Sequence, residues 1–286
     1  MDIFKKFMLA DKTVMVSVIS AKDMVDKAIK LHGLSRTASA ALGRTLIVGA
    51  FMAEQLKSET QRLTITVNGG GGLGRLVVCG EYGCKVRGYV ENPNYELPLN
   101  ANGKLDVGGA VGKNGYISVI KDMGMKEPYL GRSSLVDGEI ANDFTYYFTV
   151  SEQQPSAVAL GVLVGDEGCV ASGGIIVQIM PNCNDYVITM MEDIVSNFSN
   201  ISSLMSDFTV DEIIEKYFGH LDIFELPSQV PKYECNCNRD RIEKILLSLG
   251  KSEAYDILAT EGKVELCCQF CNTKYVFDEK ALKALF

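Results

Sequence analysis

The sequence predicts an α+β protein in three parts: a globular sheet-and-helix core domain (residues 1–180), an acidic amphipathic helical linker (181–231) and a small C-terminal zinc-binding module (232–286). Helical and strand-like patterns come in separate runs within the first part, which is typical of α+β domains and not of doubly wound sheets. The net charge of −8 resides entirely in the second part, and five of the nine cysteines fall between Cys235 and Cys271. With 286 residues, 47% of them hydrophobic, the chain can bury one large core plus smaller units.

Apolar periodicity assigns the elements of the core domain in order. Residues 13–19 are rich in valine and predict a strand, and residues 22–32 and 35–57 carry the apolar spacing of helices. Turns rich in Gly, Asn and Pro then separate four short stretches of strand character. These stretches are 62–67, 73–79, 85–90 and 116–121. The remaining elements are a helix over 140–153, which Pro155 ends, and two strands over 157–164 and 170–180.

The linker is predicted to be helical, with one apolar face and one acidic face. It holds nine acidic residues against Lys216 alone, whereas the flanking parts are each neutral, and such a one-sided segment is typical of a connector. A first helical stretch carries an apolar stripe, and Thr209 and Glu212 in capping-box spacing open a second helix that ends at Gly219. The stripe consists of Val187, Met190, Met191, Ile194, Val195, Phe198, Ile201, Leu204, Met205 and Phe208. We expect it to pack on neighbouring domains at rest, and a face that is covered only conditionally can be released.

The C-terminal module is too small to be firmly stable by itself. Asn238 is placed to cap a helix over 239–249, Ser252 to cap another ending at Thr260, and Asp278 to cap a final one; residues 264–277 resemble a hairpin. About 55 residues bury too little apolar surface for independent stability. The module therefore needs an additional stabilising cross-link.

Two close pairs of cysteines can supply that cross-link by binding a metal ion. The pattern is Cys235-Asn-Cys237, thirty residues, then Cys268-Gln-Phe-Cys271. Four thiolates satisfy the tetrahedral preference of Zn²⁺ and leave no position for water, so a structural site is expected, with one ion per chain. The two-residue gap lets one turn direct both sulfurs at one ion, and Asn272 tolerates the left-handed conformation that such a turn often needs. The alternatives are unrelated buried thiols and iron–sulfur ligation, whose ferredoxin spacings do not match.

Other candidate ligands are set aside. Cys267 would pair with Cys271 across a three-residue gap, but Cys268 is favoured, which leaves Cys267 as a spare thiol. His220 would become a ligand only if one cysteine failed, and His32 is read as a helix-end or surface residue. The singly scattered cysteines are read as small buried hydrophobic residues. These are Cys79, Cys84, Cys169 and Cys183.

A zinc site of this kind is also a candidate redox sensor. Zinc binding contributes about 10–16 kcal/mol in small peptides, as much as the whole stability of many domains, so metal loss should unfold the module. Thiolates are the form that peroxide or hypochlorite attacks, giving sulfenic acid and then a disulfide with a neighbouring thiol. Oxidation would therefore remove the ligands and the folding energy together.

Several function classes are disfavoured. The N-terminus has no apolar signal segment and residues 156–180 are broken by acidic residues, so a cytoplasmic protein without membrane contact is expected. Gly69, Gly71 and Gly74 match a dinucleotide fingerprint but precede a β-rich stretch, which favours a hairpin turn. Two histidines and no serine elbow give no basis for an enzyme. A nucleic-acid-binding zinc module remains the alternative, weakened by a neutral tail beside an acidic linker.

The cysteine pattern resembles that of the heat-shock protein 33 family of redox-regulated chaperones, and the resemblance extends over nearly the whole chain. The remaining matching segments are Ser35–Ala38 with Gly43-Arg44, Arg87–Tyr89, Glu127–Gly131, Tyr147-Phe148 and Ser151–Pro155. It implies an ATP-independent holdase, inactive when reduced with zinc. On oxidation it implies a Cys268–Cys271 disulfide, zinc release, a Cys235–Cys237 disulfide and unfolding of the linker. Unfolding client proteins are then held, often by a homodimer. Cys267 lies outside the family signature.

Overall fold

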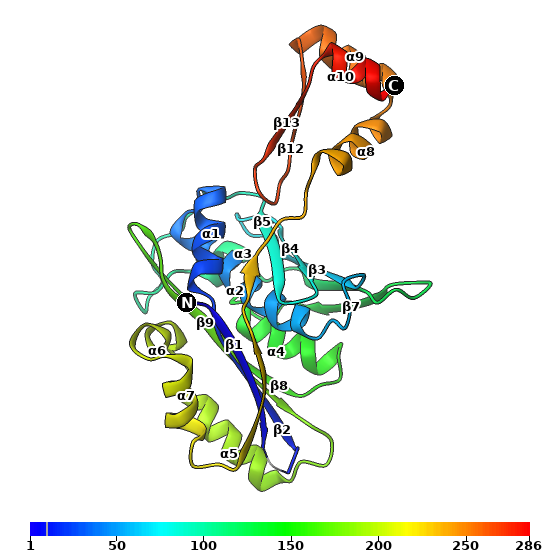
Figure 1. Ribbon diagram of the computed structural model, residues 1–286. Helices are drawn as coiled ribbons and strands as arrows, with labels where there is room; N and C mark the ends of the chain where they lie inside the picture. The colour runs from blue at the N-terminus through cyan, green and yellow to red at the C-terminus, as the bar shows by residue number, and fades with distance from the viewer. Residues whose placement is uncertain (10) are drawn as a thin grey trace. The chain divides into compact units, whose positions relative to one another are not determined.

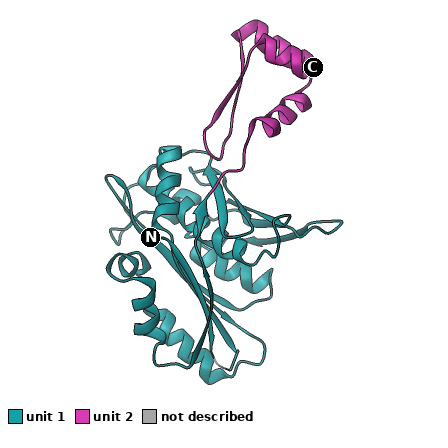
Figure 2. Cartoon of the chain, in the orientation of Figure 1, with its two compact units in different colours: residues 1–233 teal, residues 234–286 magenta. Residues whose placement is uncertain are grey.

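The computed structural model describes residues 1–9 and 11–286, which divide into two compact units, Met1–Tyr233 and Glu234–Phe286 (Figure 2). Within the first unit, two mostly antiparallel sheets and the helices that pack on them share one large core (Figure 1). The architecture is the mixed α+β one that the sequence predicts.

The first sheet joins the start of the first unit to a strand near its end. Its strand order is β10-β1-β2-β9-β8, with all neighbours antiparallel. The strands are β1 (Ile3–Leu9), β2 (Val14–Ser20), β8 (Ser156–Gly165), β9 (Gly168–Ile179) and β10 (Ile223–Gln229). Strands β2, β8 and β9 were predicted from the sequence, whereas β1 and β10 were not. The sheet therefore pairs the start of the chain with a segment more than 200 residues away.

The second sheet has the order β11-β5-β4-β3-β6-β7, antiparallel except for the short β11–β5 pair. Its strands are β3 (Arg62–Asn68), β4 (Leu76–Glu81), β5 (Lys85–Val90), β6 (Tyr116–Asp122), β7 (Tyr129–Ser134) and β11 (Lys232–Tyr233). The glycine-rich segment that resembles a nucleotide fingerprint connects β3 to β4, and no helix follows it. The hairpin interpretation is confirmed.

Helix α2 (Arg36–Glu54) is packed between the two sheets. Ser35 caps its N-terminus by accepting the Ala38 N–H. A Cβ on Gly43 would lie 2.9 Å from Val162 of β8, and one on Gly49 would lie 2.7 Å from Val78 of β4. The two glycines thus let the helix approach both sheets closely. Helix α1 (Lys22–His32) lies beside it and also matches its predicted bounds.

A buried carboxylate shapes the turn before helix α4 (Ala141–Val150). The Asp143 side chain accepts the backbone N–H groups of Val136 (2.7 Å), Asp137 (3.1 Å), Gly138 (3.3 Å) and Ile140 (2.9 Å). It also stabilises the left-handed backbone at Ile140 (φ 69°). A short helix, α3 (Val107–Val111), was not predicted.

Asp143→Ala is expected to lower the free energy of unfolding of the reduced protein by about 3 kcal/mol, because it leaves buried N–H groups without an acceptor. Urea unfolding of the reduced protein measures this change. Asn142→Ala, next to it on the same helix, removes one exposed hydrogen bond to Asp137 and should cost much less. Equal losses in the two variants would contradict the role assigned to Asp143.

The linker helices cover the face of the first sheet that points away from α2 (Figure 1). They are α5 (Asp185–Ser196), α6 (Ile201–Asp207) and α7 (Val210–Phe218). The predicted first helical stretch is divided at residues 197–200, where Asn197 bonds back to the carbonyls of the preceding turn. The Thr209–Glu212 capping box is confirmed. The linker is not helical throughout, because its last part forms strand β10.

The second unit has a small core of its own. It comprises α8 (Arg239–Leu249), α9 (Lys251–Glu261), the β12–β13 hairpin (Val264–Cys267 and Lys274–Phe277) and α10 (Glu279–Leu285). Asn238 and Asp278 cap their helices as predicted, whereas Ser252 does not, because α9 begins at Lys251 after Gly250. Six buried residues form its hydrophobic cluster, namely Ile242, Leu246, Ala254, Val264, Phe277 and Leu282. No described helix in either unit is long and apolar enough to cross a bilayer.

Candidate metal centre

Two loops of the second unit bring four cysteines together. Cys235 and Cys237 precede the N-cap of α8, and Cys268 and Cys271 lie in the turn between β12 and β13. All four sulfur atoms lie within 4.8 Å of one another. Between the loops, the Sγ atoms of Cys235 and Cys268 are 3.7 Å apart, and those of Cys237 and Cys271 are 3.3 Å apart. Loops separated by thirty residues thus form one cluster.

The β12–β13 turn directs its two thiols to the same side. The N–H groups of Cys271 and Asn272 both donate to the Cys268 carbonyl, at 3.3 and 2.8 Å, and the Cys268 N–H donates to the Thr273 carbonyl at 3.0 Å. Asn272 has φ 55°, the left-handed conformation predicted from the sequence. This arrangement is a tight turn, and the thiols on either side of its two-residue gap lie close to the same point.

The four sulfurs fit a tetrahedral ion. Zn–S bonds of about 2.3 Å place tetrahedral sulfurs about 3.8 Å apart, close to the two short distances in the cluster. Two hydroxyl groups lie near the sulfurs: Tyr275 Oη donates to Cys237 Sγ at 3.2 Å, and Thr273 Oγ1 is 3.2 Å from Cys271 Sγ. Such outer hydrogen bonds orient thiolates and reduce their charge. The donor set is soft and closed, which suits zinc and leaves no position for a substrate.

When no metal is bound, burial and hydrogen bonding shift the pKa values of these thiols in opposite directions. Burial raises the pKa of Cys235 and of Cys268. Burial also disfavours ionisation of Cys271, but hydrogen bonds with Thr273, Cys237 and Cys268 together outweigh it and lower the pKa of Cys271 to about 7. A divalent cation would therefore be needed to keep all four groups ionised together.

Cys267 is outside the cluster. It is exposed at the end of β12, opposite Lys274, whereas Cys268 is buried in the turn. The structure thus brings together the four cysteines favoured by the sequence and leaves the fifth apart.

The remaining cysteines and histidines are elsewhere. Burial raises the pKa of Cys84 to about 12 and that of Cys169 to about 11, so both are poor nucleophiles. Cys79 and Cys183 are half-buried rather than buried as expected. His220 is exposed, and His32 Nε2, in the last turn of α1, lies 3.0 Å from the Tyr233 hydroxyl. None of these residues belongs to the metal cluster found among the described residues.

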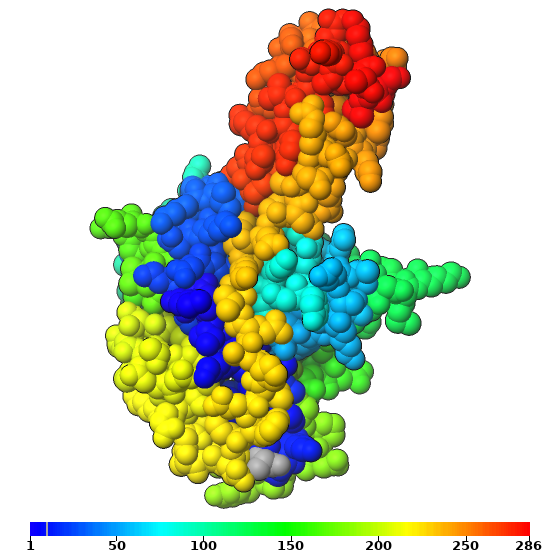
Figure 3. Space-filling view, in the orientation of Figure 1, coloured from blue at the N-terminus to red at the C-terminus, as the bar shows by residue number. Residues whose placement is uncertain are grey.

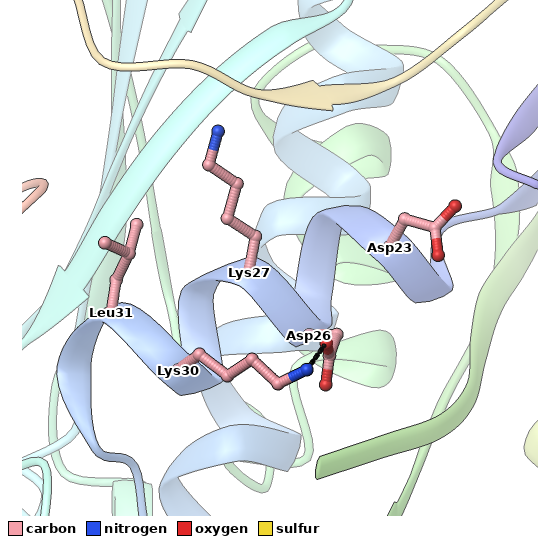
Figure 4. Close-up of a pocket in the computed structure, with 5 residues that line it drawn as sticks. All are labelled: Asp23, Asp26, Lys27, Lys30 and Leu31. Atoms are coloured by element: carbon pink, nitrogen blue, oxygen red, sulfur yellow. Dashed lines mark ion pairs between the residues drawn. The ribbon is translucent and has the colours of Figure 1, made fainter.

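A surface hollow along α1 offers no alternative site (Figure 4). Its lining includes Asp26 and Lys30, which form an ion pair at 2.6 Å. Asp26 also accepts the Cys169 N–H at 3.1 Å, so its carboxylate is already engaged. The other lining residues are Asp23, Lys27 and Leu31. None of the five is a nucleophile of the Ser, Cys or His type.

Comparison with known proteins gives a consistent result over the full length. The family model described as "Hsp33 protein" matches residues 2–278. The "33 kDa chaperonin" of Clostridium tetani is 47% identical over 269 residues, covering 92% of this chain and 90% of that protein. That of Ruminiclostridium cellulolyticum is 44% identical over 283 residues, covering 99% and 97%. The crystal structure of the Thermotoga maritima 33 kDa chaperonin superposes with a TM-score of 0.93 at 38% identity, covering 99% of this chain and 97% of that one.

Proposed function

The chain belongs to the Hsp33 family, and we propose that it is a redox-regulated, ATP-independent holdase that binds unfolding proteins and prevents their aggregation. The observation that carries the proposal is the cluster of four thiol sulfurs within 4.8 Å of one another, built into a unit with a very small core. In this protein the cysteines act as a switch and not as catalytic groups. The free thiols throughout the chain suit the reducing cytoplasm, where we place it.

In the reduced state, Cys235, Cys237, Cys268 and Cys271 would hold one Zn²⁺ ion. Metal binding of this kind supplies about 10–16 kcal/mol of folding free energy. Six buried residues are a small core for a unit of this size. The cysteines therefore decide whether the second unit is folded.

Oxidation reverses this arrangement through ordinary thiol chemistry. A Cys thiolate attacks peroxide, which becomes hydroxide and leaves the sulfur as a sulfenic acid; a neighbouring thiolate then displaces hydroxide to form the disulfide. We assign the disulfides to Cys268–Cys271 and Cys235–Cys237, following the family. Every pair of these sulfurs is close enough for a small rearrangement to join it. Each disulfide removes two ligands, and the folding energy that depends on them is lost.

We propose that the signal spreads through three functional parts: a core domain (1–180), a linker (181–231) and a switch module (232–286), whose first two residues pair with β5 in the first unit. The linker helices cover an apolar face of the core domain. The members of that face from the core strands are Phe7, Leu9, Val14, Val16, Val18, Ile175 and Val177. We propose that unfolding of the module releases the linker and exposes this face to clients, with dimerisation of the active form. The linker's surplus of acidic residues favours release by self-repulsion.

Mild peroxide at raised temperature is expected to release one zinc per chain and to suppress the aggregation of an unfolding client without ATP. A chromogenic chelator measures the zinc, and light scattering measures the aggregation. The reduced, zinc-loaded protein serves as the control and should suppress little. Equal suppression by the two forms would exclude a redox switch, and zinc release without suppression would exclude the chaperone role.

A further inference from the structure

Strand β10 is attached to the first unit mainly through its backbone; its side chains add the packing of the partly buried Ile223 and a hydrogen bond from Cys84 Sγ to Gln229 Oε1 at 3.3 Å. It pairs antiparallel with β1, with Lys6 opposite Leu226, Phe7 opposite Glu225 and Leu9 opposite Ile223. None of its seven side chains, all within the described part of the chain, is buried, and Phe224 is 63% exposed. Figure 3 shows this gold segment along the outside of the first unit, beside the blue β1.

The β1–β10 ladder is also irregular. Its register shifts between Phe4 and Lys6, where Pro227, which has no N–H to donate, lies between the paired residues of β10. An ion pair between Lys5 and Asp211 of α7 adds a link, but Asp211 is 71% exposed, so it adds little. A strand with no buried side chain and an interrupted ladder belongs to the least stable part of a fold.

Strand β1, in contrast, is firmly held without β10. Phe4, Phe7 and Leu9 are buried, and β1 pairs without interruption with β2 from Ile3 to Met8. Departure of β10 would therefore leave an intact sheet with a new open edge. The unpaired N–H and C=O groups of such an edge are a template for another strand.

We infer that β1 is the client-binding edge of the active protein: an extended segment of an unfolded client adds to β1 as an antiparallel strand in the place that β10 occupies at rest. This inference rests on the proposed release of the linker. Backbone hydrogen bonds are common to all sequences, so an edge strand suits a protein that must bind many clients. Phe7 lies on β1 and belongs to the apolar face that the linker covers. Every second side chain of a client strand paired with β1 would therefore contact that face.

The position of β1 also explains redox control. Strands β7 and β8 are sheet edges in the resting structure. An edge that is open in both states cannot make client binding depend on oxidation. The edge of β1 is closed by β10 at rest and opens with the linker, so its availability follows the switch.

A peptide of residues 222–230 tests the inference by competition. It should displace reduced, carboxymethylated α-lactalbumin from the oxidised protein, whereas the same peptide N-methylated from Ile223 to Leu226 should compete at least about tenfold more weakly, because it keeps every side chain but loses ladder donors. Equal competition by both peptides, or by neither, would overturn β1 pairing while leaving the chaperone function intact. Oxidised protein that fails to bind the client at all would instead contradict the proposed function.

Hydrogen exchange of the full chain provides the second test. Exchange of β1 amides should be slow in the reduced protein, faster after oxidation, and slow again when α-lactalbumin is bound. Strand β7 is the internal control, because its edge is open throughout and its exchange should not follow client binding. Binding of the client without renewed protection of β1 would reject the inference.

Discussion

Replacing Cys268 with serine is expected to lower the zinc affinity about 100- to 1000-fold, whereas Cys267→Ser should leave it unchanged. If four ligands share about 10–16 kcal/mol, the loss of one removes about 3–4 kcal/mol, which corresponds to two to three orders of magnitude. Cys268 is a member of the sulfur cluster and Cys267 is exposed outside it. Competition with a chelator of known affinity measures the difference.

The same pair of variants tests whether the metal holds the second unit together. Cys268→Ser should leave residues 234–286 open to proteolysis in the reduced protein at limiting zinc, since the small core is insufficient by itself. The two variants differ by one position and make the same chemical change, so a general effect of serine would appear in both. Equal loss of zinc affinity in the two would mean that the ligand is wrongly assigned.

The sequence predicted the metal cluster more accurately than the fold around it. The cysteine spacings, the left-handed Asn272 and the caps at Thr209, Asn238 and Asp278 are local features, set by residues a few positions apart, and all appear in the structure. Burial also distinguishes Cys268 from Cys267, but the sequence alone offered only their spacing.

Four strands were not predicted, namely β1, β7, β10 and β11, and the local sequence explains why β1 and β10 were missed. These two segments pair with each other across more than 200 residues, and neither carries a clear period-two pattern. Lys5 and Lys6 interrupt the alternation of β1, and Pro227 lies in β10, where a proline argues against a strand. The apolar stripe of the linker was predicted, but the surface that it covers emerges only when β1, β2 and β9 lie side by side.

Phe218→Ala is expected to activate the chaperone without oxidation. Phe218 of α7 is fully buried, and its ring packs edge-on against Phe7 of β1 at 5.1 Å between centroids. Truncating a buried phenylalanine costs about 3–5 kcal/mol. The other buried residues of α7 are Val210, Ile213 and Ile214. Because the Phe218 ring contacts the sheet directly through Phe7, its loss weakens the attachment of the linker. The reduced, zinc-loaded variant should therefore suppress client aggregation and show faster proteolysis within residues 181–231.

Phe224→Ala is the matched control, because Phe224 also lies in the linker but is 63% exposed and should change neither property. Zinc content separates the two possible origins of activation. If Phe218→Ala activates while the zinc stays bound, the linker acts downstream of the metal, and the covered face of the sheet is what the switch controls. If the variant is active only after zinc loss, the second unit and not the linker holds the protein inactive. A zinc-loaded Phe218→Ala protein whose linker is cleaved faster but which has no chaperone activity would show that the covered face is not a client surface.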